Sequence, residues 1–232
     1  MNRTDIWQGA RTGAVVAFST LPFGLLFGAV AVDGGVTPLE ATIMSATIFG
    51  GASQLVGVQL FGHHVPAWLV VLSVFAVNFR HILYSAAMAP HVQDYTLGQR
   101  LLAFFFLTDP QFAESVKRSE ETGRVSPIWY LSMAFVIYVV WVAGSALGAV
   151  FGKLITDPKA IAMDVLLPVY FLGLVLGFRR RANFLPVVAV SAAASILAMH
   201  TVGSPWHVSI GAIAGIIVAA LLPEPKGTKA ES

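Results

Sequence analysis

The chain has 232 residues, of which 56% are hydrophobic and only 11% are charged. Because soluble domains usually carry about 25% charged residues, this composition and the mean hydropathy of +0.76 exclude a soluble fold. The formal net charge of +2 gives no reason to expect a nucleic-acid partner, and the absence of cysteine excludes disulfides and thiolate metal sites. We expect one integral membrane domain over residues 1–232, with short cytoplasmic tails at about 1–11 and 223–232.

Apolar segments separated by turn residues predict an all-α membrane protein with seven or eight transmembrane helices. A helix of roughly 20 apolar residues crosses a bilayer. The first segment is too long for the core of a signal peptide, so we expect a retained helix there. The fourth segment is short and polar, and a half-helix that re-enters the membrane is the alternative to a full crossing. The candidate spans lie at 12–32, 39–61, 67–88, 99–115, 128–152, 160–178, 182–201 and 205–222.

The placement of lysine and arginine predicts that both termini are cytoplasmic. Cytoplasmic segments of membrane proteins carry an excess of these residues. With the N-terminus inside, the opposite side holds only Arg100, Lys153 and Lys159. The cytoplasmic side collects Arg3, Arg11, Lys117, Arg118, Arg124, Arg179, Arg180, Arg181, Lys226 and Lys229.

A weak internal similarity suggests an inverted repeat with broken helices. A Leu-Pro pair begins a glycine-containing apolar stretch at Leu21 and again at Leu167, and each stretch is followed by a loop and a Ser/Ala-rich helix. The first loop is acidic and the second is basic, so the charge rule places them on opposite sides. The first three spans would then match the last three. Secondary transporters commonly have such repeats, with a site at the membrane midplane.

Glycines and polar residues in the first two spans are candidates for substrate contact. Pro22 removes a helix donor and, with Gly24 and Gly28, predicts an unwound segment, whereas close helix packing is the alternative. The adjacent glycines Gly50 and Gly51 interrupt the second span and would free backbone groups for a zwitterion. Polar and aromatic neighbours extend this candidate site at Ser53, Gln54, Phe23, Phe27 and Phe49.

The third span carries a charge near its middle. Arg80 and Asn78 lie about midway through 67–88, where an unpaired charge costs several kcal/mol. Arg80 therefore needs a carboxylate, for which Asp109, Glu114 and the substrate's own carboxylate are the candidates. His81 and Tyr84 follow, and His81 is a candidate proton relay.

Two acids follow in the fourth span. Asp109 lies beside the helix-breaking Pro110, and Glu114 follows about one turn later. We expect Asp109, with His81 and Glu114, to couple transport to an ion, although Asp109 is also well placed as a helix cap. The adjacent histidines His63 and His64 point apart and have no third ligand nearby, so we expect no metal site.

These motifs resemble the AzlC family, the large subunit of bacterial branched-chain amino acid exporters. The similarity covers essentially the whole chain and is strongest from about 20 to 115. One departure is visible, because Pro110 stands where the family commonly has glutamate after Thr-Asp. The matching motifs are Leu21 to Gly28, Gly51 to Gln54, Asn78 to Ser85, Ala89 to His91, and Thr108-Asp109.

The resemblance implies an ion-driven exporter of valine, leucine, isoleucine and sometimes methionine in the bacterial inner membrane. It also implies a small four-helix membrane partner of the AzlD type, and no enzyme activity or cofactor. Arg80 and the backbone around Gly50 and Gly51 would then bind the substrate carboxylate. Asp109 or Gln54 would bind the ammonium, and the phenylalanines would bind the side chain.

Three other functions remain open at this point. A permease driven by a separate ATPase would present a cytoplasmic coupling helix, for which only 117–127 is available, and the chain itself has no Walker motif. A passive solute channel would not show saturable exchange. An intramembrane serine hydrolase would use Ser53 with His200 as its base, but Gln54 replaces the glycine that should follow the serine.

Overall fold

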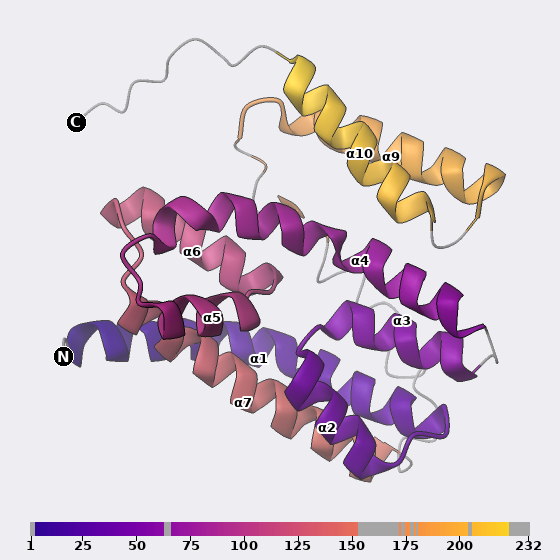
Figure 1. Cartoon of the computed structure of the whole chain (residues 1–232), viewed down its shortest axis with the longest axis horizontal. Coiled ribbons are helices and arrows are strands. Elements are labelled where there is room, and N and C mark those ends of the chain that lie inside the picture. The colour runs from indigo at the N-terminus through magenta and orange to yellow at the C-terminus, as the bar shows by residue number, and fades with distance from the viewer. Residues whose placement is uncertain are drawn as a thin grey trace.

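The computed structural model describes residues 3–62, 66–152, 172, 175–176, 179, 181–203 and 206–222. Within these ranges the chain is helical and contains no strand (Figure 1), which confirms the predicted all-α class. The elements are α1 (Arg3–Asp33), α2 (Pro38–Ile48), α3 (Gly51–Gly62), α4 (Ala67–Met88), the 3₁₀-helix η1 (Ala89–Val92), α5 (Leu97–Phe105), α6 (Asp109–Thr122), α7 (Pro127–Phe151), α9 (Phe184–Thr201) and α10 (Trp206–Leu221).

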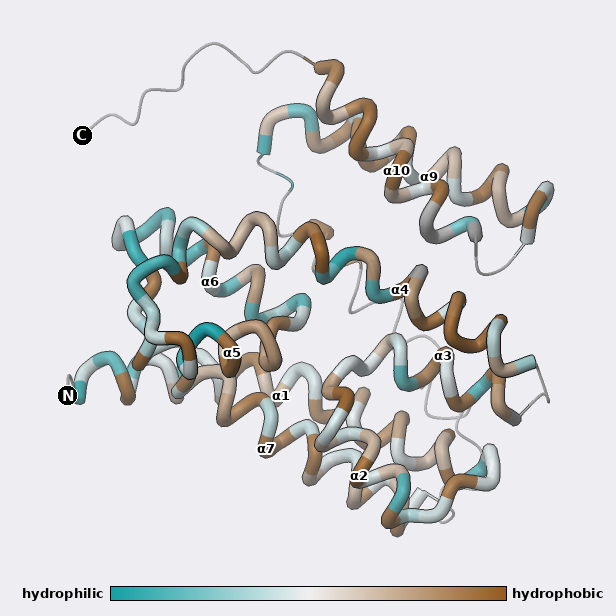
Figure 2. The backbone as a smooth tube through the Cα atoms, in the orientation of Figure 1, coloured by the Kyte–Doolittle hydropathy of each residue, from teal (hydrophilic) through white to brown (hydrophobic). Residues whose placement is uncertain are grey.

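Several helices have the length and composition of membrane spans. In the described part of the chain these are α1, α4 with η1, α7 and α9, and α10 adds a shorter apolar helix, Ile210–Leu221. Figure 2 shows hydrophobic residues along these helices and hydrophilic residues gathered near α5 and α6. Large apolar side chains face outward: Phe18 is 81% and Leu185 is 76% exposed. Such exposure suits lipid, so the chain is a multi-pass membrane protein.

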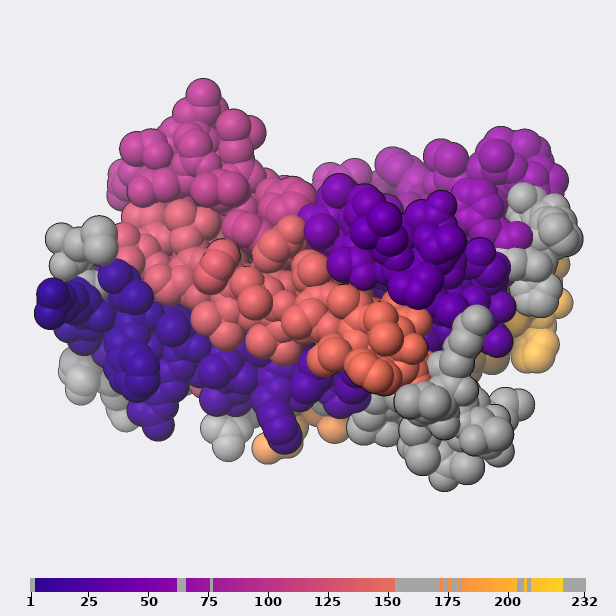
Figure 3. Space-filling view, turned by 90° about the horizontal axis from the view of Figure 1, so that it is seen from below, coloured from indigo at the N-terminus to yellow at the C-terminus, as the bar shows by residue number. Residues whose placement is uncertain are grey.

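Helices α1 and α7 form the closely packed centre of the fold. They lie side by side along most of their length (Figures 1 and 3). A Cβ atom added at Gly28 would lie 2.0 Å from the Ser145 carbonyl oxygen, and one added at Gly148 would lie 2.0 Å from that of Leu25. Glycine therefore lets the two backbones touch. Because α1 continues unbroken through Pro22, the unwound segment predicted there is wrong, and the packing alternative holds.

The predicted second span is not one helix but a hairpin of two short helices, α2 and α3. Thr37 and Glu40 form a capping box that begins α2, and α2 ends at Phe49, whose φ of 46° lies in the left-handed region. A Cβ atom at Gly34 would lie 3.2 Å from Cγ1 of Val58. Since Gly34 follows α1 directly and Val58 is in the second half of α3, α3 returns to the end of the molecule from which α2 began. The break expected at Gly50 is confirmed, but the chain reverses there instead of continuing across as the span 39–61 predicted.

The predicted fourth span is a second hairpin, formed by α5 and α6. Thr96 and Gln99 form another capping box at the start of α5. The Tyr95 hydroxyl donates to the Val125 carbonyl at 3.1 Å, so the start of α5 lies next to the end of α6. Burial raises the pKa of Tyr95, which keeps this phenol a donor. The segment 99–115 is therefore not one continuous helix, and of the two alternatives left open by the sequence, the re-entrant one fits the structure.

The two hairpins enter from opposite ends and meet in the middle of the molecule (Figure 1). Phe49 in the first break and Phe106 in the second have ring centroids 6.0 Å apart. Tyr138 of α7 contacts both rings, at 5.2 and 5.3 Å. This inverted pair of hairpins differs from the predicted repeat of the first and last three spans, which stays a prediction because most of 160–178 lies outside the described residues.

One end of the molecule gathers most of the basic segments that were predicted to be cytoplasmic. Arg118 lies 3.9 Å from Asp5, and Arg181 lies 2.5 Å from Glu120. Arg100, which was predicted on the opposite side, belongs to this end because its Nε atom donates to the Tyr95 carbonyl at 2.9 Å. The second hairpin turns back toward the N-terminus, which explains this correction. The cytoplasmic identity of this end stays a prediction.

Candidate functional site

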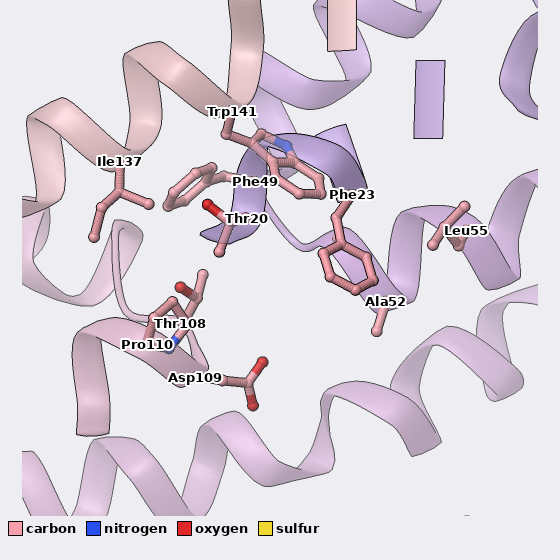
Figure 4. Close-up of a pocket in the computed structure, with 11 residues that line it drawn as sticks. Thr20, Phe23, Phe49, Ala52, Leu55, Thr108, Asp109, Pro110, Ile137 and Trp141 are labelled. Carbon is pink, nitrogen blue, oxygen red and sulfur yellow. The ribbon is translucent and has the colours of Figure 1, made fainter. Parts of the chain in front are cut away.

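A cavity of about 70 Å³ lies where the two helix breaks meet (Figure 4). Helices α1 and α7 form one wall, and the first residues of α3 and α6 form the other. Most of its lining is aromatic or aliphatic, and the polar groups are two threonines and an aspartate. The lining residues are Thr20, Phe23, Phe49, Gly51, Ala52, Leu55, Thr108, Asp109, Pro110, Ile137 and Trp141.

The charged corner of the cavity is an ion pair between Asp109 and Arg80. Arg80 Nη1 of α4 lies 3.0 Å from Asp109 Oδ1, and the Tyr84 hydroxyl donates to the same oxygen at 2.8 Å. The two charged side chains are 25% and 14% exposed, so each is shielded enough to need the other. Stacking of Tyr84 on Phe112, with centroids 4.4 Å apart, fixes the phenol. The carboxylate that Arg80 was expected to need is therefore Asp109.

Two helix N-termini open onto this cavity. Gly51 and Ala52 are the first residues of α3, and Asp109 and Pro110 are the first residues of α6. The leading amides of a helix have no acceptor within the helix, and its N-terminus carries a partial positive charge. The amides of Gly51 and Ala52 are therefore available for an anionic group. Pro110 has no N–H, so α6 presents the Asp109 carboxylate at this point instead.

A buried polar network holds the first break in place. Gln54 accepts a hydrogen bond from the Gly50 amide at 3.0 Å and donates to Ser45 Oγ at 3.1 Å. Ser45 donates to Ser145 of α7 at 2.8 Å. The three side chains are fully buried, so each polar atom that lost its partner would carry a desolvation cost of about 1–3 kcal/mol. The network thereby links α2, α3 and α7 directly behind the cavity.

Some of the site residues predicted in the first two spans line the cavity, and the others support the surrounding helices. Phe23 and Gly51 line the cavity. Ser53 donates to the Gly50 carbonyl at 2.7 Å, and the Gly50 amide donates to Gln54, so the backbone groups predicted to be free at Gly50 are occupied within the break. The Gly51 amide donates no hydrogen bond to the described residues. The positions that do not line the cavity are Gly24, which faces the α7 backbone, Phe27 in the core, Gly50, Ser53 and Gln54.

The predicted polar residues of α4 and α6 are also separated. Arg80 and Tyr84 contact Asp109. His81, the residue after Arg80, instead has its Nδ1 atom 3.3 Å from the Asn78 carbonyl oxygen. Asn78 Oδ1 is buried and has no hydrogen-bond partner among the described residues. Glu114 does not reach the cavity and lines a different one, nearer the end of the molecule that contains the N-terminus.

Helix α7 also contributes to the site, which the sequence did not predict. Trp141 and Ile137 line the cavity together with Thr20 of α1. A Cβ atom at Gly51 would lie 2.7 Å from Cη2 of Trp141, so glycine is needed there for close approach. The signal was present, because tryptophan prefers the membrane interfaces and Trp141 lies in the middle of the predicted span 128–152.

The geometry does not favour the serine hydrolase alternative. Ser53 is only 3% exposed and its hydroxyl donates to the Gly50 carbonyl. His200 lies at the end of α9, and in the described part of the chain Ser53 and His200 form no hydrogen bond. The histidines His63 and His64 lie outside the described residues.

Comparison with known proteins gives a consistent assignment. The family model described as AzlC protein matches residues 15–155, which include α2 to α7 and α1 from residue 15 onward. The inner membrane protein YgaZ of Escherichia coli is 30% identical over 92% of this chain and 89% of its own length. The branched-chain amino acid transport protein AzlC of Bacillus subtilis is 25% identical over 84% of this chain and 79% of its own. An uncharacterized membrane protein of Archaeoglobus fulgidus is 30% identical over 91% of this chain and 93% of its own.

No solved structure matches the chain. The matched region contains both hairpins and every residue that lines the central cavity. The chain therefore belongs to the AzlC family.

Proposed function

We propose that this protein is the large subunit of a secondary exporter of branched-chain amino acids. Its substrates would be valine, leucine, isoleucine and methionine, and its direction would be outward across the bacterial inner membrane. Family membership and the transport protein of Bacillus subtilis support a role in membrane transport. The observation that carries the finer proposal is the central cavity, which combines an apolar lining with a single ion pair.

The cavity has the groups that a zwitterion with an apolar side chain requires. The substrate ammonium would bind the Asp109 carboxylate. The substrate carboxylate would bind the free amides of Gly51 and Ala52, aided by the dipole of α3. Its side chain would pack against Phe23 and Ile137. A charged or strongly polar side chain would meet no partner there, which supports selection of aliphatic amino acids.

The Asp109–Arg80 pair supports a coupling mechanism. In the structure, Asp109 has Arg80 and Tyr84 as partners. A substrate ammonium would compete with Arg80 for the carboxylate and leave Arg80 to the substrate carboxylate. A proton on Asp109 would remove its attraction for the ammonium, so alternate binding of proton and substrate would couple their fluxes. We assign His81 to the relay of that proton, because it lies next to Arg80 on α4.

The remaining predicted residues are assigned supporting roles. Ser53 and Gln54 fix the break that exposes the Gly51 amide. Gly24 and Phe27 pack α1 on its neighbours. The small four-helix AzlD-type subunit is proposed as the partner, and co-purification of a tagged chain with that subunit, set against the tagged chain expressed alone, tests it.

Counterflow in proteoliposomes tests the function. Vesicles containing this protein with its small partner are loaded with unlabelled leucine, and uptake of labelled leucine is followed. We expect saturable uptake that valine, isoleucine and methionine inhibit and that glutamate and lysine do not. Uptake that rises linearly with concentration would support a channel instead. Uptake that requires ATP would support the permease alternative.

A further inference from the structure

A second, larger cavity lies near the N-terminal end of the molecule, between α1, α6 and the start of α7. Its volume is about 400 Å³, against about 70 Å³ for the central cavity. We call it the vestibule, and it is lined by Gln8, Arg11, Thr12, Val15, Val16, Glu114, Lys117, Arg118, Glu121 and Trp129. By the distribution of basic residues, this end is the predicted cytoplasmic end.

One wall of the vestibule is fixed by Arg118. Its Nη2 atom donates to Gln8 Oε1 at 2.9 Å, and its guanidinium lies over the ring of Trp129, 5.3 Å from the centroid. Asp5 lies 3.9 Å away and adds an opposite charge. Arg118 therefore joins α6 to α1 and α7, and its charge has partners within the protein.

The other charged side chains of the vestibule have no bonding partner in the described part of the chain. Within the described ranges Arg11, Lys117, Glu114 and Glu121 form no salt bridge and no side-chain hydrogen bond. Two of these groups are cations and two are anions, and they come from α1 and from α6. A cavity whose lining offers both signs of charge matches a free α-amino acid, which carries one of each.

The vestibule and the central cavity are lined by successive turns of the same three helices, α1, α6 and α7. On α1, Val16 lines the vestibule and Thr20 lines the central cavity, one turn further. On α6, Glu114 and Pro110 have the same relation. On α7, the fully buried Met133 separates Trp129 of the vestibule from Ile137 of the central cavity. A short apolar layer thus divides the two spaces.

From this arrangement we propose that the vestibule captures zwitterionic amino acids on the cytoplasmic side before they pass to the central cavity. Glu114 holds the ammonium, and Arg11 with Lys117 holds the carboxylate. The inference rests on the proposed transport function and adds a second binding site to it. Glu114, which sequence reasoning placed at the coupling site, belongs in this account to substrate capture.

Kinetics measured separately from the two membrane faces test the proposal. Right-side-out and inside-out vesicles containing the protein and its partner are used with Glu114→Gln and with the double variant Arg11→Gln and Lys117→Gln. At the cytoplasmic face we expect KM for leucine to rise at least about threefold with the maximal rate unchanged. At the opposite face KM should stay at the wild-type value, which also shows that the variants are folded.

Glu120→Gln is the matched control, because Glu120 lies on the same helix but pairs with Arg181 and does not line the vestibule. Equal changes of KM at both faces, or no change at the cytoplasmic face, would overturn the vestibule proposal while wild-type transport stands. Absence of amino-acid transport by the folded wild-type protein would instead remove the proposed function, and the vestibule proposal with it.

Discussion

At the scale of single residues, Asp109 has two roles that substitution can separate. It compensates the charge of Arg80 within the membrane, and we propose that it binds the substrate ammonium. Asp109→Asn leaves an acceptor for the Tyr84 hydroxyl but leaves Arg80 without its charge partner. We expect transport to fall by about tenfold or more, which corresponds to at least about 1.4 kcal/mol, and the melting temperature in detergent to fall as well.

The double variant Arg80→Gln with Asp109→Asn distinguishes the two roles. Removal of both charges abolishes the cost of a lone buried ion, so the melting temperature should recover toward that of the wild type. Transport should not recover, because the ammonium ligand is still absent. Recovery of leucine counterflow in the double variant would show that Asp109 is structural only.

Gly51 gives a second prediction at this scale. In Gly51→Ala the added Cβ atom would lie 2.7 Å from Cη2 of Trp141, so the indole, which lines the cavity, must shift. We expect the KM for leucine to rise severalfold with little loss of stability. Gly57→Ala on the same helix is the control, because its nearest atom would lie 3.8 Å away. Equal leucine KM values for the two variants would exclude Trp141 from the wall of the binding site.

At the scale of elements, the first hairpin depends on Gln54. Gln54→Leu leaves the Gly50 amide and Ser45 with one partner fewer in a buried place. Each loss costs about 1–3 kcal/mol, so we expect lower thermal stability and slower transport. Gln59→Leu makes the same change at an exposed position of α3 and should have neither effect. If both variants transport leucine like the wild type, the network does not position the break.

The sequence predicts an element well when residues close together in the chain determine it, and poorly when contacts between distant segments determine it. The break at Gly50 was predictable because adjacent glycines forfeit helix propensity at that point. The continuity of α1 through Pro22 was not, since it depends on packing of Gly28 and its neighbours against α7. The sign in the sequence of the reversal from α5 to α6 was that the fourth predicted span is short and polar. Charge alone predicted that Arg80 needs a carboxylate but left Asp109, Glu114 and the substrate open, and the fold selects Asp109. Trp141 joins the cavity only through the crossing of α7 and α3.

At the scale of the whole molecule, the two opposed hairpins change the expected topology. An arrangement in which every predicted span crosses would place Asp94 on the side opposite to Arg124. The hairpin arrangement places them at the same end, because Tyr95 bonds Val125. Asp33, at the far end of α1, then lies on the other side.

The absence of cysteine makes this topology simple to test. Single variants Asp94→Cys, Arg124→Cys and Asp33→Cys are treated with a membrane-impermeant maleimide in sealed right-side-out and inside-out vesicles. We expect Asp94→Cys and Arg124→Cys to react in the same vesicles and Asp33→Cys in the opposite ones. Reaction of Asp94→Cys together with Asp33→Cys would contradict the re-entrant second hairpin.

Equilibrium binding of labelled leucine to the purified protein, in the presence of its small partner, tests the central claim most directly. The account predicts saturable binding that valine, isoleucine and methionine displace, that glutamate and lysine do not, and that Asp109→Asn and Gly51→Ala both weaken. Absence of saturable leucine binding by the folded wild-type protein would contradict it. So would binding that neither substitution alters, because the substrate would then lie outside the cavity between the two hairpins.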